Sequence, residues 1–240
     1  MTDKNESASA SSPRPTSPVR NAVSPGQAAL AWTHTARFLT TASQLKELPA
    51  TELPEIAFVG RSNAGKSTAI NRLAQQKRLA FASKTPGRTQ HINLFELGPK
   101  DAPDALFADL PGYGYAAVAR GAKLRWQQVM ADYLELRRSL SGIVLMIDSR
   151  LGATDLDRQL MSFIAPRVGC GEVKLLVLLT KADKLSRNEA AAALAAMQAL
   201  LGEFGTEQSD IGVALFSALK KTGIEGAALE LHGWAHGAGR

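Results

Sequence analysis

The 240-residue sequence has only one cysteine, Cys170, and four histidines that are scattered along the chain. A single cysteine excludes an intramolecular disulfide framework and a cysteine-rich zinc site. The spacing of His34, His91, His232 and His236 does not predict a metal cage built from histidine. One cysteine in a chain of this size is typical of a reducing compartment, so we expect a cytoplasmic protein.

Long apolar segments are also missing. The mean hydropathy is −0.08, and the sequence contains no run of about 18 apolar residues, the length that a membrane span needs. We therefore expect no membrane-spanning helix and no membrane partner. The chain is basic overall, because 28 Lys and Arg against 22 Asp and Glu give a net charge of +6. A basic balance of this size permits an anionic partner without identifying one.

Residues 1–26 differ in composition from the rest of the chain. They contain six serines, four prolines and almost no large apolar side chain. Such a segment buries too little surface to offset the entropy of ordering it, so we expect a disordered tail. It carries three basic and two acidic residues, which leaves a charge of +5 (6 − 1) on the remainder. We predict one folded domain over residues 27–236 and a frayed C-terminus over 237–240.

The body alternates short apolar runs with segments of helical periodicity. This order predicts an α/β fold with a mostly parallel sheet of six strands and helices on both faces. We expect strands at residues 55–59, 90–97, 105–109, 143–148, 173–179 and 211–216. We expect helices from Lys66 onward and at residues 123–140, 156–168, 189–201 and 224–235. Trp32 and Phe38 indicate an ordered extension before the first of these strands.

The strongest functional signal is a phosphate-binding loop between the first strand and the first helix. It has the pattern G-x-x-x-x-G-K-[ST] in the strand–loop–helix context that supports it. Its residues are Gly60, Arg61, Ser62, Asn63, Ala64, Gly65, Lys66 and Ser67. Backbone N–H groups and the helix N-terminus supply a fixed positive potential for phosphates. Lys66 adds a charge at the β and γ phosphates, and the Ser67 hydroxyl is expected to ligate Mg²⁺, as in a P-loop NTPase.

Two later loops predict which base is bound. Their residues are Thr180, Lys181, Ala182, Asp183, Phe216, Ser217 and Ala218. The Asp183 carboxylate can accept hydrogen bonds from guanine N1–H and from the exocyclic amine together, whereas adenine offers no such donor pair. The Ala218 N–H could meet guanine O6. Thr180 stands where asparagine is usual and reaches fewer atoms, so we expect a lower nucleotide affinity.

Two loops between these motifs have the chemistry to respond to the γ-phosphate. One consists of Asp109, Leu110, Pro111 and Gly112 at the end of a strand. Its aspartate can hold Mg²⁺ through water, and its glycine lets a backbone N–H reach the γ-phosphate. The other is the basic connector at residues 84–90, where a threonine hydroxyl can complete Mg²⁺ coordination. Thr85 and Thr89 both satisfy this chemistry.

Together these motifs resemble the guanine-nucleotide-binding module of translation-factor-type GTPases. The stretches G-R-S-N-A-G-K-S, K-T-P-G-R-T-Q-x-I-N, D-L-P-G-Y-G-Y-A and T-K-A-D are similar to those of the EngB family of ribosome-biogenesis GTPases, also called YsxC or YihA. The resemblance extends over residues 35–235 and implies a Ras-like fold. It also implies that Thr89 binds Mg²⁺ together with Ser67. The further GTP-binding positions that it implies are Gly87, Arg88, Thr89, Gln90 and His91.

The function implied by this resemblance is a GTP-hydrolysing switch that acts in assembly of the large ribosomal subunit, with a link to cell division and septation in some members. We expect a monomer whose partner is the large subunit or its rRNA precursor, and no DNA contact. One alternative is a nucleotide-sensing interaction module in cell division without ribosome contact. Another is a P-loop kinase, which would need an acceptor pocket and a catalytic base. The two base-recognition loops argue against the kinase.

Basic residues recur near the segments that should respond to the γ-phosphate. They are Arg72, Lys77, Arg78, Lys84, Arg88, Arg120, Lys123 and Arg125. We interpret each one as a solvated surface residue and the set as a candidate contact for a polyanion such as RNA.

The expected catalytic groups are those of Lys66, Thr89, Gly112 and Asn63. Many GTPases orient the attacking water with a glutamine just after the Asp-x-x-Gly motif. Here that position is Tyr113, whose ring cannot do this, so we expect slow intrinsic hydrolysis. Tyr113 and Tyr115 are either core residues or exposed contacts of a moving loop, whereas Trp126 and Tyr133 are expected in the core.

Asn63 leads to a prediction about K⁺. Related GTPases with asparagine at this point of the loop use it to hold a K⁺ ion, which supplies positive charge where an arginine finger would. We expect K⁺ to raise the rate of GTP hydrolysis more than Na⁺ does, and Asn63→Ala to remove the difference. Steady-state turnover in the two salts at equal ionic strength measures this, and identical rates for the unaltered protein would contradict it.

Overall fold

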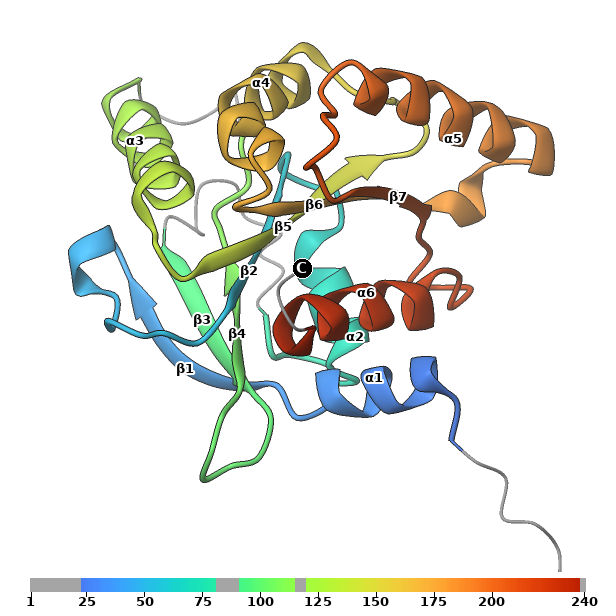
Figure 1. Ribbon diagram of the computed structural model, residues 1–240. Helices are drawn as coiled ribbons and strands as arrows, with labels where there is room; N and C mark the ends of the chain where they lie inside the picture. The colour runs from blue at the N-terminus through green and yellow to red at the C-terminus, as the bar shows by residue number, and fades with distance from the viewer. Residues whose placement is uncertain (1–22, 81–90, 115–119, 238–240) are drawn as a thin grey trace, which may run out of the picture.

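The computed structural model describes the backbone of residues 23–80, 91–114 and 120–237, and in its helix at 120–136 it describes the side chains from residue 128 onward. Its centre is one sheet of seven strands in the order β1-β3-β4-β2-β5-β6-β7 (Figure 1). The strands are β1 Arg37–Ala42, β2 Glu55–Gly60, β3 Ile92–Leu97, β4 Ala105–Asp109, β5 Leu140–Asp148, β6 Lys174–Thr180 and β7 Ile211–Leu215. The helices are α1 Pro25–Thr33, η1 Leu45–Glu47, α2 Lys66–Leu73, α3 Arg120–Leu136, α4 Asp155–Gly169, η2 Ala182–Lys184, α5 Arg187–Gly202 and α6 Ile224–His236.

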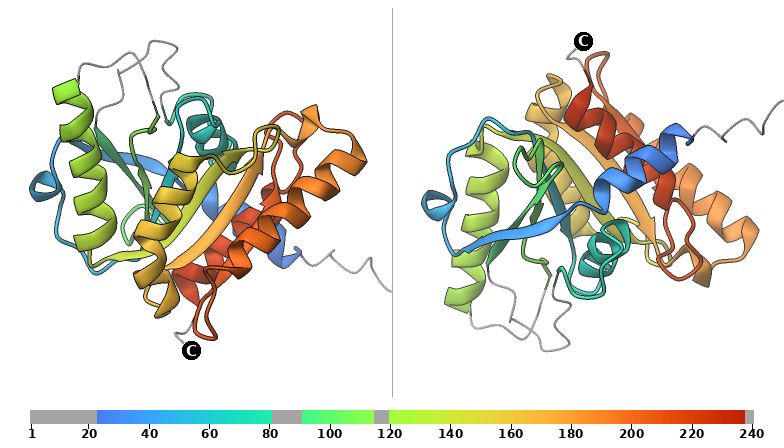
Figure 2. Two further views of the ribbon diagram at one scale, coloured as in Figure 1. Left: turned by 90° about the horizontal axis from the view of Figure 1, so that it is seen from above. Right: turned by 90° about the horizontal axis from the view of Figure 1, so that it is seen from below.

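Helices cover both faces of the sheet, as the alternation of patterns predicts (Figures 1 and 2). Helices α1, α2 and α6 pack on one face, and α3, α4 and α5 pack on the other. The central strands are almost entirely apolar because both of their faces are buried. In β2, for example, Ile56 and Phe58 belong to the core under α2 and α6, whereas Ala57 and Val59 belong to the core under the other three helices. Among the described residues, none of the helices combines the length and the apolar character needed to cross a membrane.

The sheet has one strand more than the six that the sequence pattern predicts. The extra strand, β1, pairs antiparallel with β3 at the edge of the sheet. Its residues Phe38 and Leu39 are exposed, so the strand lacks the apolar alternation by which a half-buried strand is recognised. Four of the six strand pairings are parallel, and the predicted mostly parallel sheet is confirmed.

The N-terminal boundary of the ordered domain lies earlier than the composition predicts. Helix α1 begins at Pro25, so residues 25 and 26 are helical and not part of a disordered tail. Ser24 caps this helix by accepting a hydrogen bond from the Gln27 N–H at 3.2 Å, and proline suits the first helical position. Trp32 anchors the helix, because its Nε1–H donates to Asp104 at 2.9 Å. The remaining residues assigned to the tail, 1–22, lie outside the described part.

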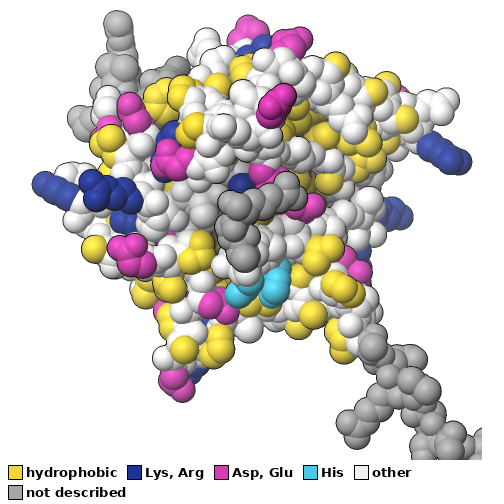
Figure 3. Space-filling model, viewed as in Figure 1, with side chains coloured by type: hydrophobic (Ala, Val, Ile, Leu, Met, Phe, Trp, Pro, Cys, Tyr) yellow, Lys and Arg dark blue, Asp and Glu magenta, His cyan; other side chains and the backbone are white. Residues whose placement is uncertain are grey.

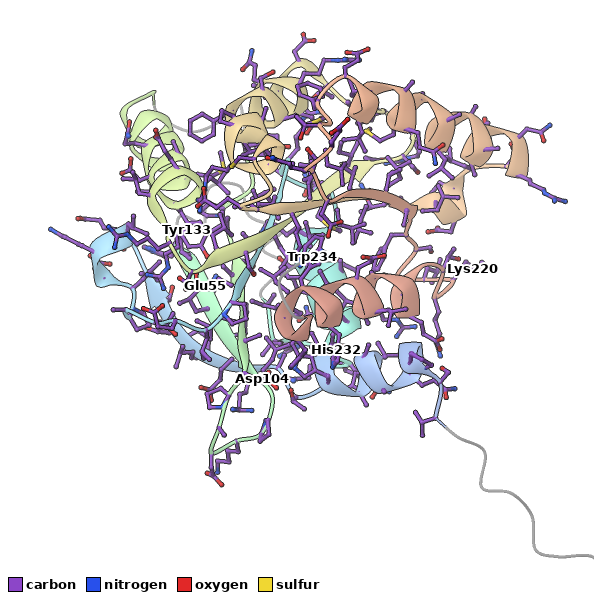
Figure 4. All side chains as sticks on the ribbon, viewed as in Figure 1. Glu55, Asp104, Tyr133, Lys220, His232 and Trp234 are labelled. Carbon is purple, nitrogen blue, oxygen red and sulfur yellow. The ribbon has the colours of Figure 1, made fainter. Side chains whose placement is uncertain are left out.

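Helix α3 ends at Leu136, four residues before the predicted end, and Leu140 begins β5. The cause is Glu55, a fully buried carboxylate at the start of β2. It accepts hydrogen bonds from the Tyr133 hydroxyl at 2.5 Å, from Arg137 Nε at 2.9 Å and from the Ser139 hydroxyl at 2.9 Å (Figure 4). These contacts turn the chain out of the helix toward the sheet, because a buried carboxylate requires them. Tyr133 is a core residue, as predicted, while the Trp126 side chain lies outside the described residues.

The packing of α6 on the sheet gives a testable prediction at Gly142. A Cβ at this position in β5 would lie 2.2 Å from Cε3 of the buried Trp234 (Figure 4 labels the tryptophan). We expect Gly142→Ala to lower the free energy of unfolding by about 1–3 kcal/mol, because the indole has to shift within a packed core. Urea denaturation measures this.

Gly226→Ala is the matched control. Gly226 is an exposed residue of α6, the helix that contains Trp234, and no described atom lies within 4 Å of a Cβ built at Gly226. This substitution should be neutral or stabilising by up to about 1 kcal/mol, because alanine favours the helix. Equal stability of the two variants would show that α6 does not pack closely on β5.

Candidate nucleotide-binding site

The candidate site lies at one end of the sheet, where five loops meet. Strands β2, β4, β5, β6 and β7 run parallel, so the loops that follow them emerge at the same edge. In open α/β sheets this edge is where ligands bind. The four loops predicted from sequence motifs follow β2, β4, β6 and β7.

The phosphate-binding loop connects β2 directly to α2. Helix α2 begins at Lys66, so the N–H groups of its first turn face the loop. Gly65 precedes the helix with a φ of 97°, a left-handed conformation that favours glycine. Asn63 also has a positive φ, 67°. The local sequence thus provides the turn that a phosphate chain needs.

Lys66 and Asp109 form a buried ion pair at the centre of the site. The Lys66 ammonium contacts Oδ1 of Asp109; the lysine is 8% exposed and the aspartate fully buried. Within the described part of the chain, the other oxygen of Asp109, Oδ2, is buried without a hydrogen-bond partner. A buried, unsatisfied carboxylate oxygen attracts a hard cation, and the Ser67 hydroxyl is a second oxygen donor beside Lys66 in the sequence. These residues therefore fit the Mg²⁺ that the motifs imply; the other implied ligand, Thr89, lies outside the described residues.

The loop after β4 is hydrogen-bonded to the phosphate-binding loop. The Ser62 N–H donates to the Tyr113 carbonyl at 2.8 Å, and the Tyr113 N–H donates to the Gly60 carbonyl at 3.2 Å. Gly112 packs so closely that a Cβ would lie 3.2 Å from the Ser62 backbone. Leu110 and Pro111 are buried. This contact joins two of the predicted motifs physically.

Tyr113 is a core residue, which decides between the two alternatives that the sequence leaves open for it. It is 4% exposed, and its hydroxyl donates to Asp157 of α4 at 2.5 Å. Burial and the neighbouring carboxylate raise the pKa of Tyr113 well above its ordinary value. Tyr115 lies outside the described residues.

The loops after β6 and β7 come together at the expected base-recognition site. The Ser217 hydroxyl donates to Asp183 Oδ1 at 2.7 Å, and the Ala182 N–H donates to the Phe216 carbonyl at 3.2 Å. The Ser217 hydrogen bond lowers the pKa of Asp183, so its carboxylate stays ionised and can accept from a base. Ala218 follows as a half-buried residue.

Thr180 connects the base-recognition loop to the phosphate-binding loop. Its hydroxyl lies 2.6 Å from the Ala64 carbonyl and 3.1 Å from the Ile147 carbonyl, and it is buried. A hydroxyl has one proton, so it donates to one carbonyl at a time. Thr180 therefore makes a loop-to-loop contact even though it is shorter than the usual asparagine.

The structure does not place every predicted site residue. Thr85, Gly87, Arg88, Thr89 and Gln90 lie outside the described residues. His91, which the resemblance assigns to the site, is exposed, and its Nδ1 lies 2.8 Å from the Ser43 hydroxyl beyond the end of β1.

The sequence motifs do not include two charged residues at the start of the fifth loop, which follows β5. They are Asp148, the last residue of β5, and Arg150. Asp148 ends β5 and binds both Arg150 and Lys181. The position of Asp148 in the sequence could have identified it, because Asp148 ends β5 just as Asp109 ends β4.

Comparison with known proteins decides the family. Residues 55–181 match the model of a family described as "50S ribosome-binding GTPase". A probable GTP-binding protein EngB of Acidovorax ebreus (strain TPSY) is 62% identical over 207 residues, which cover 86% of this chain and 91% of that protein. The chain belongs to the EngB family of GTP-binding proteins. A second EngB relative, from Polaromonas sp. (strain JS666 / ATCC BAA-500), is 58% identical over 221 residues and covers 91% of this chain and 87% of its own length.

Solved structures agree with this assignment at the level of the fold. A crystal structure of a probable GTP-binding protein engB matches with a TM-score of 0.54 and 20% identity, covering 77% of this chain and all of that one. Era in complex with MgGDPNP and nucleotides 1506–1542 of 16S ribosomal RNA matches with a TM-score of 0.61 and 21% identity, covering 80% of this chain and 59% of that one. As an EngB-family P-loop GTPase, the protein binds and hydrolyses GTP.

Base selection can be tested at Asp183. Asp183 Oδ1 is engaged by Ser217, so in Asp183→Asn the Ser217 hydroxyl would continue to bind the amide oxygen and the NH₂ group would take the place of Oδ2. An NH₂ donor matches the C2 carbonyl of xanthine but not the amine of guanine. We therefore expect lost GTP binding and gained XTP binding in equilibrium titrations.

The exposed Asp210→Asn is the control and should bind GTP like the unaltered protein. If Asp183→Asn also binds GTP normally, the base is recognised elsewhere.

Proposed function

We propose that this EngB-family GTPase is a nucleotide-controlled switch that binds the large ribosomal subunit, or its rRNA precursor, and assists its assembly in the cytoplasm. The observation that carries the proposal is the backbone contact between the phosphate-binding loop and the Asp109–Gly112 turn. A change at the γ-phosphate reaches that turn directly, and through it the segment that follows. The description of the matching family as ribosome-binding supplies the class of partner.

In this function each group of the site has a distinct part. Lys66 would hold the β and γ phosphates, Ser67 and Thr89 would hold Mg²⁺, and Asp109 would act on the metal through water. Mg²⁺, when bound, neutralises charge that develops on the phosphate oxygens. The Gly112 N–H meets the γ-phosphate, and Asp183 selects guanine.

Hydrolysis by this site alone should be slow. The residue after the Asp-x-x-Gly motif is Tyr113, whose hydroxyl is committed to Asp157. The attacking water therefore has to be held by backbone groups or by a group that the partner supplies. We propose that the Asn63 side chain holds a K⁺ ion, which supplies positive charge where an arginine finger would. The Asn63 backbone carbonyl accepts a hydrogen bond from the Lys181 ammonium at 2.8 Å.

The described surface suggests where a polyanion would bind. On the face drawn in Figure 3, Lys and Arg side chains are interspersed with Asp and Glu, which is typical of a solvated surface. Lys77 and Arg78 are exposed after the end of α2, and in the sequence they precede the connector at residues 84–90. Lys84, Arg88 and the side chains of Arg120, Lys123 and Arg125 lie outside the described residues. We propose Lys77 and Arg78 as part of the RNA contact.

Co-sedimentation with purified large subunits tests this function. We expect stronger binding with a non-hydrolysable GTP analogue than with GDP, and a loss of tenfold or more between about 50 and 200 mM salt, because RNA binding releases counterions. Lys77→Glu with Arg78→Glu should weaken subunit binding and leave GTP affinity unchanged.

The matched control is Lys46→Glu with Arg138→Glu. Both residues are exposed and belong to other segments of the chain, so this double charge reversal should bind subunits normally. Equal binding in the two nucleotide states would contradict the switch. Absence of subunit binding in every state would favour the nucleotide-sensing module in cell division instead.

A further inference from the structure

The loop after β5 carries a charge cluster that none of the nucleotide-binding motifs includes. Asp148 is the last residue of β5 and lies opposite Thr180 in the neighbouring strand. Its side chain is 9% exposed. A carboxylate buried to this extent requires partners, and here it has two cationic ones.

Arg150 binds both oxygens of the Asp148 carboxylate. Its Nε donates to Oδ1 at 3.0 Å and its Nη2 donates to Oδ2 at 2.7 Å. The Arg150 backbone N–H adds a third hydrogen bond to Oδ1 at 3.1 Å. A two-point guanidinium–carboxylate contact of this kind fixes the orientation of the carboxylate in addition to stabilising its charge. The Asp148 carboxylate is therefore held in one orientation.

The second partner of Asp148 is Lys181 of the base-recognition loop. Its ammonium donates to Asp148 Oδ2 at 2.8 Å and to the Asn63 carbonyl at 2.8 Å. Lys181 thus spans the distance from the loop after β5 to the phosphate-binding loop. Its backbone has a φ of 57°, an uncommon conformation for a residue with a side chain. Both the backbone and the ammonium of this lysine are thus held in place.

We propose that Asp148 and Arg150 are positioning residues for guanine-nucleotide binding. They hold the Lys181 ammonium against Asn63, so that the base-recognition loop and the phosphate-binding loop keep a fixed relative placement. A nucleotide binds the base-recognition loop with its base and the phosphate-binding loop with its phosphates. Its affinity is higher when the two loops already have the right relative placement before it binds. Neither residue is expected to touch the reacting phosphate.

The electrostatics of the cluster support this role. The Arg150 guanidinium and, next, the Lys181 ammonium hold the pKa of Asp148 far below its ordinary value, so the carboxylate stays ionised under all physiological conditions. Asp183 adds a further favourable interaction with Arg150. Without Asp148, the long and flexible lysine side chain would keep only its contact with Asn63.

The first experiment compares GDP affinities by calorimetry. Asp148→Asn keeps the size of the side chain but removes its charge, and we expect about tenfold weaker binding, as for loss of a charge-assisted hydrogen bond. The same factor should apply to a non-hydrolysable GTP analogue, because Lys181 does not act on the γ-phosphate. Arg150→Ala should weaken binding by about threefold, since the arginine is half-exposed and acts through Asp148.

The controls are Asp210→Asn and Arg138→Ala, which change exposed residues of the same types away from the cluster. Both should bind GDP like the unaltered protein. Thermal melting of all four variants confirms that they are folded at the temperature of the titration.

A double-mutant cycle separates positioning from a general effect on the fold. If Asp148 acts through Lys181, Asp148→Asn should cause no further loss in a Lys181→Met background. An undiminished tenfold loss in that background would overturn the proposal, and so would normal GDP binding by Asp148→Asn. The measurement is nucleotide affinity alone, so its outcome is independent of ribosome binding.

Discussion

A buried ammonium and a buried carboxylate face each other where β2 and β4 end, and the geometry of the site follows from this pair. Lys66 and Asp109 are both shielded from water, and neither charge could be left there alone, because an unpaired buried charge is strongly destabilising. The pair therefore holds the start of α2 against the end of β4. A nucleotide with Mg²⁺ would bring an anion for the lysine and a cation for the aspartate, so binding would exchange partners without leaving either charge isolated.

Around this pair, the phosphate-binding loop is connected to each of its neighbours by specific hydrogen bonds. Ser62 binds the carbonyl of Tyr113, the Ala64 carbonyl accepts from Thr180, and the Asn63 carbonyl accepts from Lys181. The loop after β4 and the loop after β6 thus contact three successive residues of one short segment. The phosphate-binding loop is therefore in direct contact with both the Asp109–Gly112 turn and the base-recognition loop.

The sequence predicts which loops meet at one end of the sheet better than it predicts the edges of the fold. Motif residues such as Lys66 and Asp183 are recognisable because their chemistry requires particular residue types at particular strand ends. Strand β1 is not recognisable in this way, since its pairing with β3 joins residues 50 or more positions apart and Phe38 remains exposed. The pattern extends α3 to residue 140 because Leu140 fits a helical spacing and a strand equally well, and it contains no sign of the long-range contacts that Arg137 and Ser139 make with Glu55. Asp148 belongs to none of the motifs, and its partner Lys181 is brought to it by the pairing of β5 with β6 and not by a local pattern.

The contact between Tyr113 and Asp157 has a consequence for how this site could evolve. Asp157 also receives hydrogen bonds from the Thr154 N–H and hydroxyl at the start of α4, so the tyrosine completes a buried cluster. Exchange of Tyr113 for a glutamine, the residue with which many GTPases orient water, would leave Asp157 short of a donor and open space in the core. A faster intrinsic reaction would thus come with a less stable protein. Selection for stability alone therefore opposes that change.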